Sequence, residues 1–173
     1  MYNNASTPVH RGFDHFYGYF NGYEDYWSHS VALGAIPGVE PVQNGFLDLH
    51  DDGELVRDKN GTYGPEIFSE RVTAMIEDHK NNYASSPMFL YYAMQNVHDP
   101  LEAMDVDLAY PACRNITNAY RKTFCGMAHS ADRALANLTA ALRDAFEGEE
   151  VVTVISGVPI SHHQSLRTLV FCC

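Results

Sequence analysis

The sequence predicts an α/β fold with parallel strands, and two observations carry this prediction. The residues from Met88 to Met94 form an apolar run without a charge, which is typical of a strand covered on both faces and hence of a parallel strand. A second apolar run covers 151–155, and a long helical pattern separates the two. The order helix, strand, helix, strand therefore predicts a parallel βαβ unit with a right-handed crossover.

The residues before the first helix predict little regular structure. Residues 1–29 are rich in aromatic side chains and glycine, which favours irregular packed structure over a helix. Residues 30–63 carry many Gly and Pro residues and predict a surface excursion with one short hairpin. Asp51-Asp52-Gly53 looks superficially like a metal-binding pair, but no apolar strand precedes it, so a solvated turn is expected.

Two amphipathic helices are expected from spacing. The first begins near Pro65, and its apolar face is made by Phe68, Val72, Met75, Ile76 and His79. The second ends near Gly148, and one 3.6-residue stripe holds Tyr120, Phe124, Met127, Ala131, Leu135, Leu138 and Leu142.

His98 is the candidate site residue that follows from position alone. Open α/β sheets bind ligands outside the carboxyl ends of their strands, and His98 lies just past the run from Met88 to Met94, with Pro100 ending it. The simpler interpretation is a strand-end histidine bonded to Asp99 or to backbone. Asn96 either lines the same cleft or caps the turn.

Composition restricts the classes of partner. A net charge of -11 argues against nucleic acid, and no apolar run is long enough to span a bilayer. The start of the chain has no secretory signal peptide. Sequons for N-glycosylation, which favour the secretory pathway, stand at Asn4, Asn60, Asn115 and Asn137. Cys113 and Cys125 can pair in an oxidising compartment and are expected as free thiols in a reducing one.

Three passages, in order, carry a resemblance to a known family. Residues 11–29 contain R-G-F-D, then G-Y, then D-Y and S-H; residues 87–100 contain P-M-F-L-Y and Q-N-V-H-D-P; residues 125–142 contain C-G-M and N-L-T-A-A-L. These passages resemble the sulfatase family and, within it, the arylsulfatase B type. The resemblance runs from about Arg11 to Ser156 and implies an alkaline-phosphatase-like α/β sulfatase fold, present in part.

The resemblance also implies a chemistry. Sulfatases hydrolyse sulfate esters, on sulfated glycans or aryl sulfates, with a formylglycine nucleophile and a bound calcium ion. His98 matches the histidine that contacts the sulfate or assists the leaving group in the family, so it is the expected catalytic and substrate-binding residue. A lysosomal or secreted location and a glycoprotein are implied as well.

Several family motifs are missing from these 173 residues. No C-x-[PS]-S-R motif occurs, and Gly157-Val158-Pro159 stands where the family has the calcium-binding D-N-G. We therefore expect a partial sulfatase domain over 1–156 and a divergent tail over 157–173, an internal segment that holds no metal and is inactive alone. The His162-His163 pair in the tail is expected to bind at most a stray metal ion. The alternatives are a non-catalytic relic or splice product that binds sulfated glycans weakly, and a phosphodiesterase or phosphatase of the same superfold.

Overall fold

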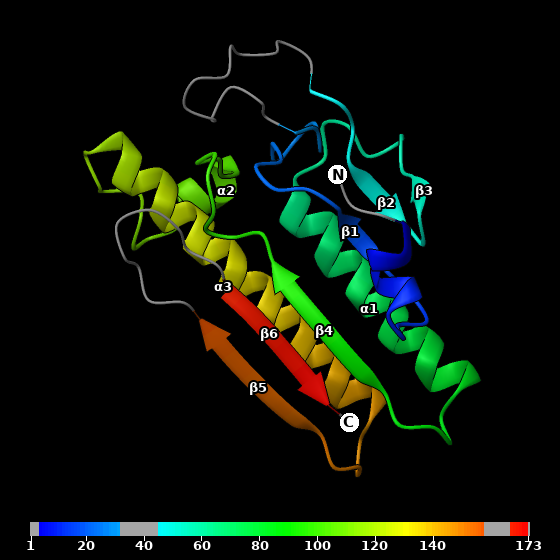
Figure 1. Ribbon diagram of the computed structural model, residues 1–173. Coiled ribbons are helices and arrows are strands. Elements are labelled where there is room, and N and C mark those ends of the chain that lie inside the picture. The colour runs from blue at the N-terminus through cyan, green and yellow to red at the C-terminus, as the bar shows by residue number, and fades with distance from the viewer. Residues whose placement is uncertain (1–3, 32–44, 158–166, 173) are drawn as a thin grey trace. The chain divides into compact units, whose positions relative to one another are not determined.

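The computed structural model describes residues 4–31, 45–157 and 167–172. The chain divides into two compact units, an N-terminal unit of residues 1–68 and a C-terminal unit of residues 69–173 (Figure 1). The His162-His163 pair and most of the expected tail lie outside the described residues.

The N-terminal unit contains a small antiparallel sheet. Two short 3-10 helices, η1 (Asn4–Ser6) and η2 (Pro8–His10), come before β1 (Tyr17–Tyr19), β2 (Leu49–Asp51) and β3 (Glu54–Leu55). Strand order is β1-β2-β3, with Gly18 opposite His50. Asp52 and Gly53 link β2 and β3 with positive φ angles of 49° and 100°, which a tight hairpin turn requires. The predicted hairpin and turn are therefore confirmed.

Aromatic rings fill the core of this unit. Tyr26 and Tyr63 are almost fully buried and stack with ring centroids 5.5 Å apart, and Trp27 lies 5.1 Å from Tyr63. Phe68 meets the rings of Tyr17 and Tyr19 edge-on. Packing between aromatic rings therefore forms much of the core of this unit.

The C-terminal unit holds a sheet and the longest helix. Helix α1 (Gly64–Asn82) starts at the boundary and leads to β4 (Phe89–Met94), a short α2 (Asp105–Leu108), α3 (Ala119–Ala145), β5 (Val152–Gly157) and β6 (Arg167–Cys172). Figure 1 shows α3 running along one face of the sheet formed by β4, β5 and β6. Both predicted helices are confirmed. On α1, Ile67, Val72 and Ile76 are buried, and on α3 the buried apolar residues run from Met127 to Leu142.

The sheet corrects the predicted βαβ unit in one respect. Strand order is β4-β6-β5, and β6 is antiparallel to both neighbours, so β4 and β5 run parallel to each other without pairing. The sequence of β6, RTLVFC, contains β-branched and aromatic residues, which favour a strand. The strand lies between β4 and β5, which were predicted to pair directly. Part of the expected divergent tail thus pairs with both predicted strands.

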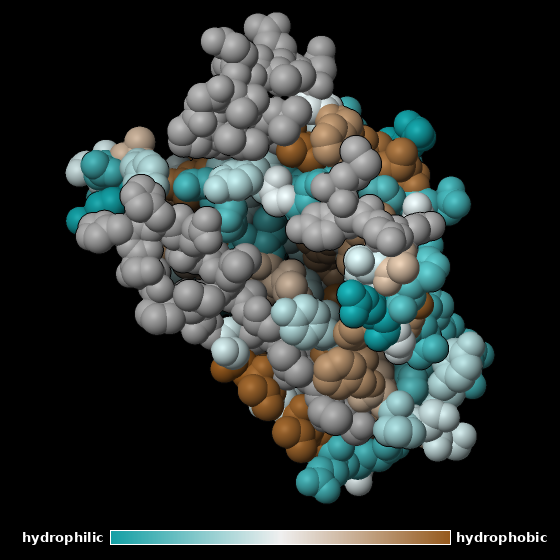
Figure 2. Space-filling view, viewed as in Figure 1, coloured by the Kyte–Doolittle hydropathy of each residue, from teal (hydrophilic) through white to brown (hydrophobic). Residues whose placement is uncertain are grey.

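The prediction of strands covered on both faces was also wrong. Along β4 the side chains alternate strictly, with Leu90, Tyr92 and Met94 buried and Phe89 and Tyr91 about half exposed. Val154 of β5 is in register with Tyr91 across β6, so it shares the uncovered face. Figure 2 shows apolar surface at the edge of the sheet where β5 lies. The outward-facing residues of β4 are apolar too, so its sequence looks like that of a strand buried on both faces.

Helix α3 begins with a side-chain cap and a glycine contact. The Asn118 carboxamide oxygen accepts a hydrogen bond from the Arg121 backbone N–H, which satisfies one of the free donors of the first turn. Farther along, a Cβ on Gly126 would lie 3.0 Å from Ala103 Cβ and from Leu108 Cδ2. Glycine at this position therefore allows α2 and the residues just before it to pack closely on α3. Tyr120, which the predicted stripe includes, is 65% exposed.

Among the described helices, none combines the length and the apolar composition that crossing a membrane would need.

Candidate functional site

The turn after β4 carries the residue that the sequence singles out. His98 follows the last strand residue, Met94, by four positions, and its backbone N–H donates to the Gln95 carbonyl oxygen at 3.0 Å. Its side chain is partly exposed, while Asn96 and Val97 beside it are 1% and 4% exposed. His98 therefore lies at the surface, while the two residues before it in the turn are buried.

The contact of the imidazole ring with the backbone sets which ring nitrogen carries the hydrogen. Nδ1 of His98 lies 2.7 Å from the Asp99 carbonyl oxygen, and because a carbonyl only accepts, Nδ1 carries the hydrogen. In the neutral ring, Nε2 is then the nitrogen that carries no hydrogen. A fixed ring orientation of this kind suits general acid or base catalysis.

Asn96 anchors the turn and does not line a cleft. Its side-chain Nδ2 donates to the Met127 carbonyl oxygen of α3 at 2.9 Å, deep in the C-terminal unit. The sequence left open a cleft-lining residue or a cap of the turn, and this bond to α3 is neither of these. The hydrogen bond ties the His98 turn to the longest helix of the unit.

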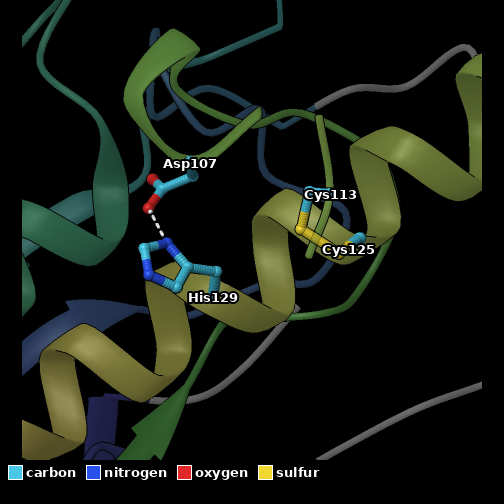
Figure 3. The surroundings of a disulfide bond; sticks show 4 residues. All are labelled: Asp107, Cys113, Cys125 and His129. Carbon is cyan, nitrogen blue, oxygen red and sulfur yellow. Dashed lines mark hydrogen bonds and ion pairs between the residues drawn. A yellow bond between two sulfur atoms is a disulfide. The ribbon is translucent and has the colours of Figure 1, made fainter. Parts of the chain in front are cut away.

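A buried ionic cluster lies on the connection that follows His98, and sequence reasoning missed it. Asp107 of α2 is fully buried and accepts a hydrogen bond from His129 Nδ1 at 2.7 Å (Figure 3). It also accepts from Arg133 Nε and Nη2 at 2.9 and 3.1 Å. The Tyr110 ring stacks on His129 with centroids 3.7 Å apart. His129 and Arg133 stand four residues apart on α3, and this spacing was the available signal.

The same connection is closed by a disulfide. Cys113 and Cys125 are bonded, with Cα atoms 5.6 Å apart, and Figure 3 shows the bond beside the Asp107 cluster. A disulfide and a buried ion pair therefore both hold residues 105–125 in place. Each acts from α3, the helix that also anchors Asn96.

The N-terminal unit contains a second polar network, centred on two buried carboxyl groups. Asp48 accepts from the backbone N–H groups of Phe20 and Asn21 and from the Asn21 side chain at 2.7–3.1 Å. Burial and a hydrogen bond with Asp48 raise the pKa of Glu24 from its ordinary 4.5 to about 8. Glu24 thus stays protonated and donates to the Asp48 carboxylate at neutral pH.

His29 belongs to this unit as a buried neutral residue. Its Nε2 donates to the Lys59 carbonyl oxygen at 3.0 Å, and its Nδ1 accepts from the Tyr19 hydroxyl at 2.8 Å. Burial lowers the pKa of His29 and raises that of Tyr19. Asp25 accepts from the backbone N–H groups of Trp27 and Ser28. Asp25 and His29 therefore have structural roles in this unit.

The expected glycosylation sites lie in different settings. Asn60 stands in an exposed turn, and Asn115 is exposed between Cys113 and α3. Asn137 is in the middle of α3, where its side-chain amide donates to Ser69 Oγ at 3.3 Å.

The calcium implied by the resemblance has no ligand set in the described part of the chain. No cluster of three or more His, Cys, Asp or Glu side chains capable of holding a metal ion occurs there. Of the two buried carboxyl groups, Asp48 accepts from three N–H donors, and burial raises the pKa of Glu24 to about 8. The residues that the structure describes therefore do not fit the cation.

Comparison with known proteins identifies the family. The sulfatase family model matches residues 1–157. The chain belongs to the sulfatase family. Among curated relatives, it is similar to Arylsulfatase J of Mus musculus, with 33% identity over 144 residues, and to an Arylsulfatase of Klebsiella aerogenes, with 26% identity over 101 residues.

The matched segment is short relative to these proteins. It spans 83% of this sulfatase chain but 22% of the mouse protein, and 58% of this chain but 20% of the bacterial one. Two solved structures share its fold: Ps i-CgsB, with a TM-score of 0.71, and Ps i-CgsB in complex with k-i-k-neocarrahexaose, with a TM-score of 0.72. Each is 23% identical, and each match covers 98% of this chain and 41% of that one. The alkaline-phosphatase-like α/β sulfatase fold is therefore present in part.

Proposed function

We propose that the chain is part of a sulfuric ester hydrolase of the arylsulfatase B type, acting on sulfated glycans or aryl sulfates, in which His98 assists the leaving group. The sulfatase family match and the place of His98 at the end of β4 together support this. The observation that carries it is the hydrogen bond from Nδ1 of His98 to the Asp99 carbonyl oxygen, because it fixes the orientation of the ring at the end of β4.

The role of His98 follows from the chemistry of sulfate esters. Attack on sulfur breaks the bond between sulfur and the leaving oxygen, and negative charge develops on that oxygen. In the proposed step, Nε2–H of the imidazolium gives its proton to the leaving oxygen, which departs as an alcohol while the ring becomes neutral. A positioned general acid of this kind contributes on the order of 10² to 10⁴ in rate.

The 173-residue chain by itself is proposed to be inactive. It contains no C-x-[PS]-S-R sequence from which a formylglycine nucleophile could be made, and no D-N-G follows β5. The nucleophile and the calcium ion of the family are therefore proposed to belong to the complete enzyme. Catalytic groups that act as a unit lose nearly all their rate when one is removed, so His98 alone is not expected to turn over substrate.

The setting of the cysteines and sequons supports a lysosomal or secreted glycoprotein. Cys113 and Cys125 are bonded, and disulfides of this kind persist in oxidising compartments. Asn60 and Asn115 are exposed sequon asparagines. We propose that both carry N-linked glycans.

A second candidate is a non-catalytic sulfatase segment that binds sulfated glycans. The observation that favours it is the sequence Gly157-Val158-Pro159, which replaces a metal-binding motif.

Two measurements decide between the candidates. The first is a transcript read through both ends of this reading frame, where C-x-[PS]-S-R upstream and D-N-G after Ser156 support the hydrolase. The second is hydrolysis of an aryl sulfate by the purified 173-residue chain, with and without calcium, for which no turnover is expected. Calcium-dependent turnover by this chain would overturn the proposal that it is inactive alone.

A further inference from the structure

A cavity in the C-terminal unit lies apart, in the chain, from the turn that holds His98. It has a volume of about 280 Å³ and is lined by Ile116, Tyr120, Arg121, Phe124 and Cys125. Four of these residues come from the first two turns of α3, and Ile116 comes from the segment just before the helix. The Cys113–Cys125 disulfide joins that segment to the helix, so the cavity is preformed.

Charge in this part of the chain is opposite to that of the whole. The chain carries 22 Asp and Glu against 11 Lys and Arg, yet residues 108–131 hold Arg114, Arg121 and Lys122 and no Asp or Glu. The side chain of Arg121 enters no hydrogen bond or ion pair with the residues that the structure describes. An arginine left without an acidic partner beside a cavity is available to an anion from solution.

Two aromatic rings also line the cavity. Tyr120 and Phe124 stand four residues apart on α3 and so share a face of the helix. Tyr120 is 65% exposed, although the rest of its helical stripe is largely buried. Aromatic faces stack on the apolar faces of sugar rings, and a guanidinium binds the oxygens of a sulfate in bidentate fashion.

We propose that this cavity is a binding subsite for one sulfated sugar unit of a glycan, with Arg121 on the sulfate and Tyr120 and Phe124 against the ring. The inference rests on the proposed function for the choice of a sulfated ligand. It adds a site, remote from His98 in the chain, that would hold a distant unit of the same polymer. The volume of about 280 Å³ is of the order needed for one monosaccharide.

The test is a titration of the 173-residue chain, as an Asn115→Gln protein to remove a glycan beside the cavity. The probe is k-i-k-neocarrahexaose, compared with its desulfated counterpart. Loss of a charge-assisted hydrogen bond predicts that Arg121→Gln weakens binding about tenfold, and loss of stacking predicts that Tyr120→Ala weakens it several-fold. Lys122→Gln and Arg143→Gln remove the same charge from α3 without touching the cavity, and each is expected to change affinity less than about twofold.

The outcomes separate a built site from general electrostatic attraction. Equal losses for Arg121→Gln, Lys122→Gln and Arg143→Gln would show diffuse attraction only and would overturn the proposal. Binding of the desulfated hexasaccharide with the same affinity would overturn it as well.

The two proposals can fail independently. If His98→Ala abolishes binding and Arg121→Gln leaves it unchanged, the cavity is not a subsite, and the proposed function stands. If Arg121→Gln weakens binding while the complete enzyme has no sulfatase activity, the cavity binds sulfated sugar and the proposed hydrolysis is wrong.

Discussion

The stability of the N-terminal unit is predicted to fall as pH rises, because of Glu24. Its carboxyl group is 6% exposed, and burial next to Asp48 raises its pKa from 4.5 to about 8. Between these two pH values the unfolded chain has released the proton and the folded chain still holds it. Folding therefore binds a proton, and the stabilisation is fully present below pH 4.5 and is lost as pH rises to about 8.

The size of the effect follows from the same two pKa values. At about 1.36 kcal/mol per pH unit, the gap between 4.5 and about 8 sets an upper figure of about 5 kcal/mol. Glu24→Gln replaces the donated O–H by an N–H and has no proton to lose. This protein should therefore retain at pH 8 the stability that the parent chain has lost.

The assay is urea unfolding at pH 5, 6.5 and 8, followed by fluorescence. Trp27 is the single tryptophan of the chain and packs on Tyr63 in the N-terminal unit, so its emission reports on that unit. Burial lowers the pKa of His29, whose contribution is lost as pH falls below 6.5, and this term is common to both proteins. The difference between the two curves therefore isolates Glu24.

Glu54→Gln is the matched control, since Glu54 is exposed on β3 and its removal should leave the pH dependence unchanged. Parallel curves for the parent chain and Glu24→Gln would refute the reasoning. They would mean that Glu24 is ionised in the folded state at neutral pH.

Three further changes test how the C-terminal unit is held together. Gly126→Val should cost about 2–3 kcal/mol in urea unfolding, because its Cβ would lie 3.0 Å from Ala103 Cβ, whereas Ala136→Val on the exposed face of α3 should cost under about 1 kcal/mol. Equal costs would rule out the close contact. Asp107→Asn should lower the free energy of unfolding by about 2–4 kcal/mol because it takes the buried carboxylate away from Arg133 and His129, and an unchanged value would contradict a stabilising cluster. Replacing both cysteines of the Cys113–Cys125 bond by Ser should cost about 3 kcal/mol on the chain-entropy model for a separation of 12 residues, and equal midpoints would show that the loop is fixed without the bond.

The sequence predicted the elements that depend on local pattern. Helices α1 and α3 follow from their apolar spacing, and the turn at Asp52-Gly53 follows from residues that tolerate positive φ. The place of His98 at a strand end also followed, since an uncharged run stopped by proline is a local signal.

What escaped prediction depends on contacts between distant residues. β6 pairs with strands that precede it by up to about 80 positions, and its antiparallel place between β4 and β5 leaves no trace in its own composition. Asp107 meets His129 from 22 residues away, and Glu24 meets Asp48 from 24. A carboxyl group in a sequence is read as solvated, because such groups are mostly exposed, and only burial reveals its role.

The central claim, that His98 protonates the leaving group, is tested most directly by the leaving-group dependence of kcat in the full-length product of the reading frame that contains residues 1–157. His98→Gln is compared with the parent and with His79→Gln, a control whose ring likewise contacts a backbone carbonyl oxygen, that of Ser86. The account predicts that His98→Gln lowers kcat on an unactivated sugar sulfate by about 10² or more and on p-nitrophenyl sulfate by much less, because a good leaving group needs no proton. Equal losses on both substrates, or losses matched by His79→Gln, would contradict it.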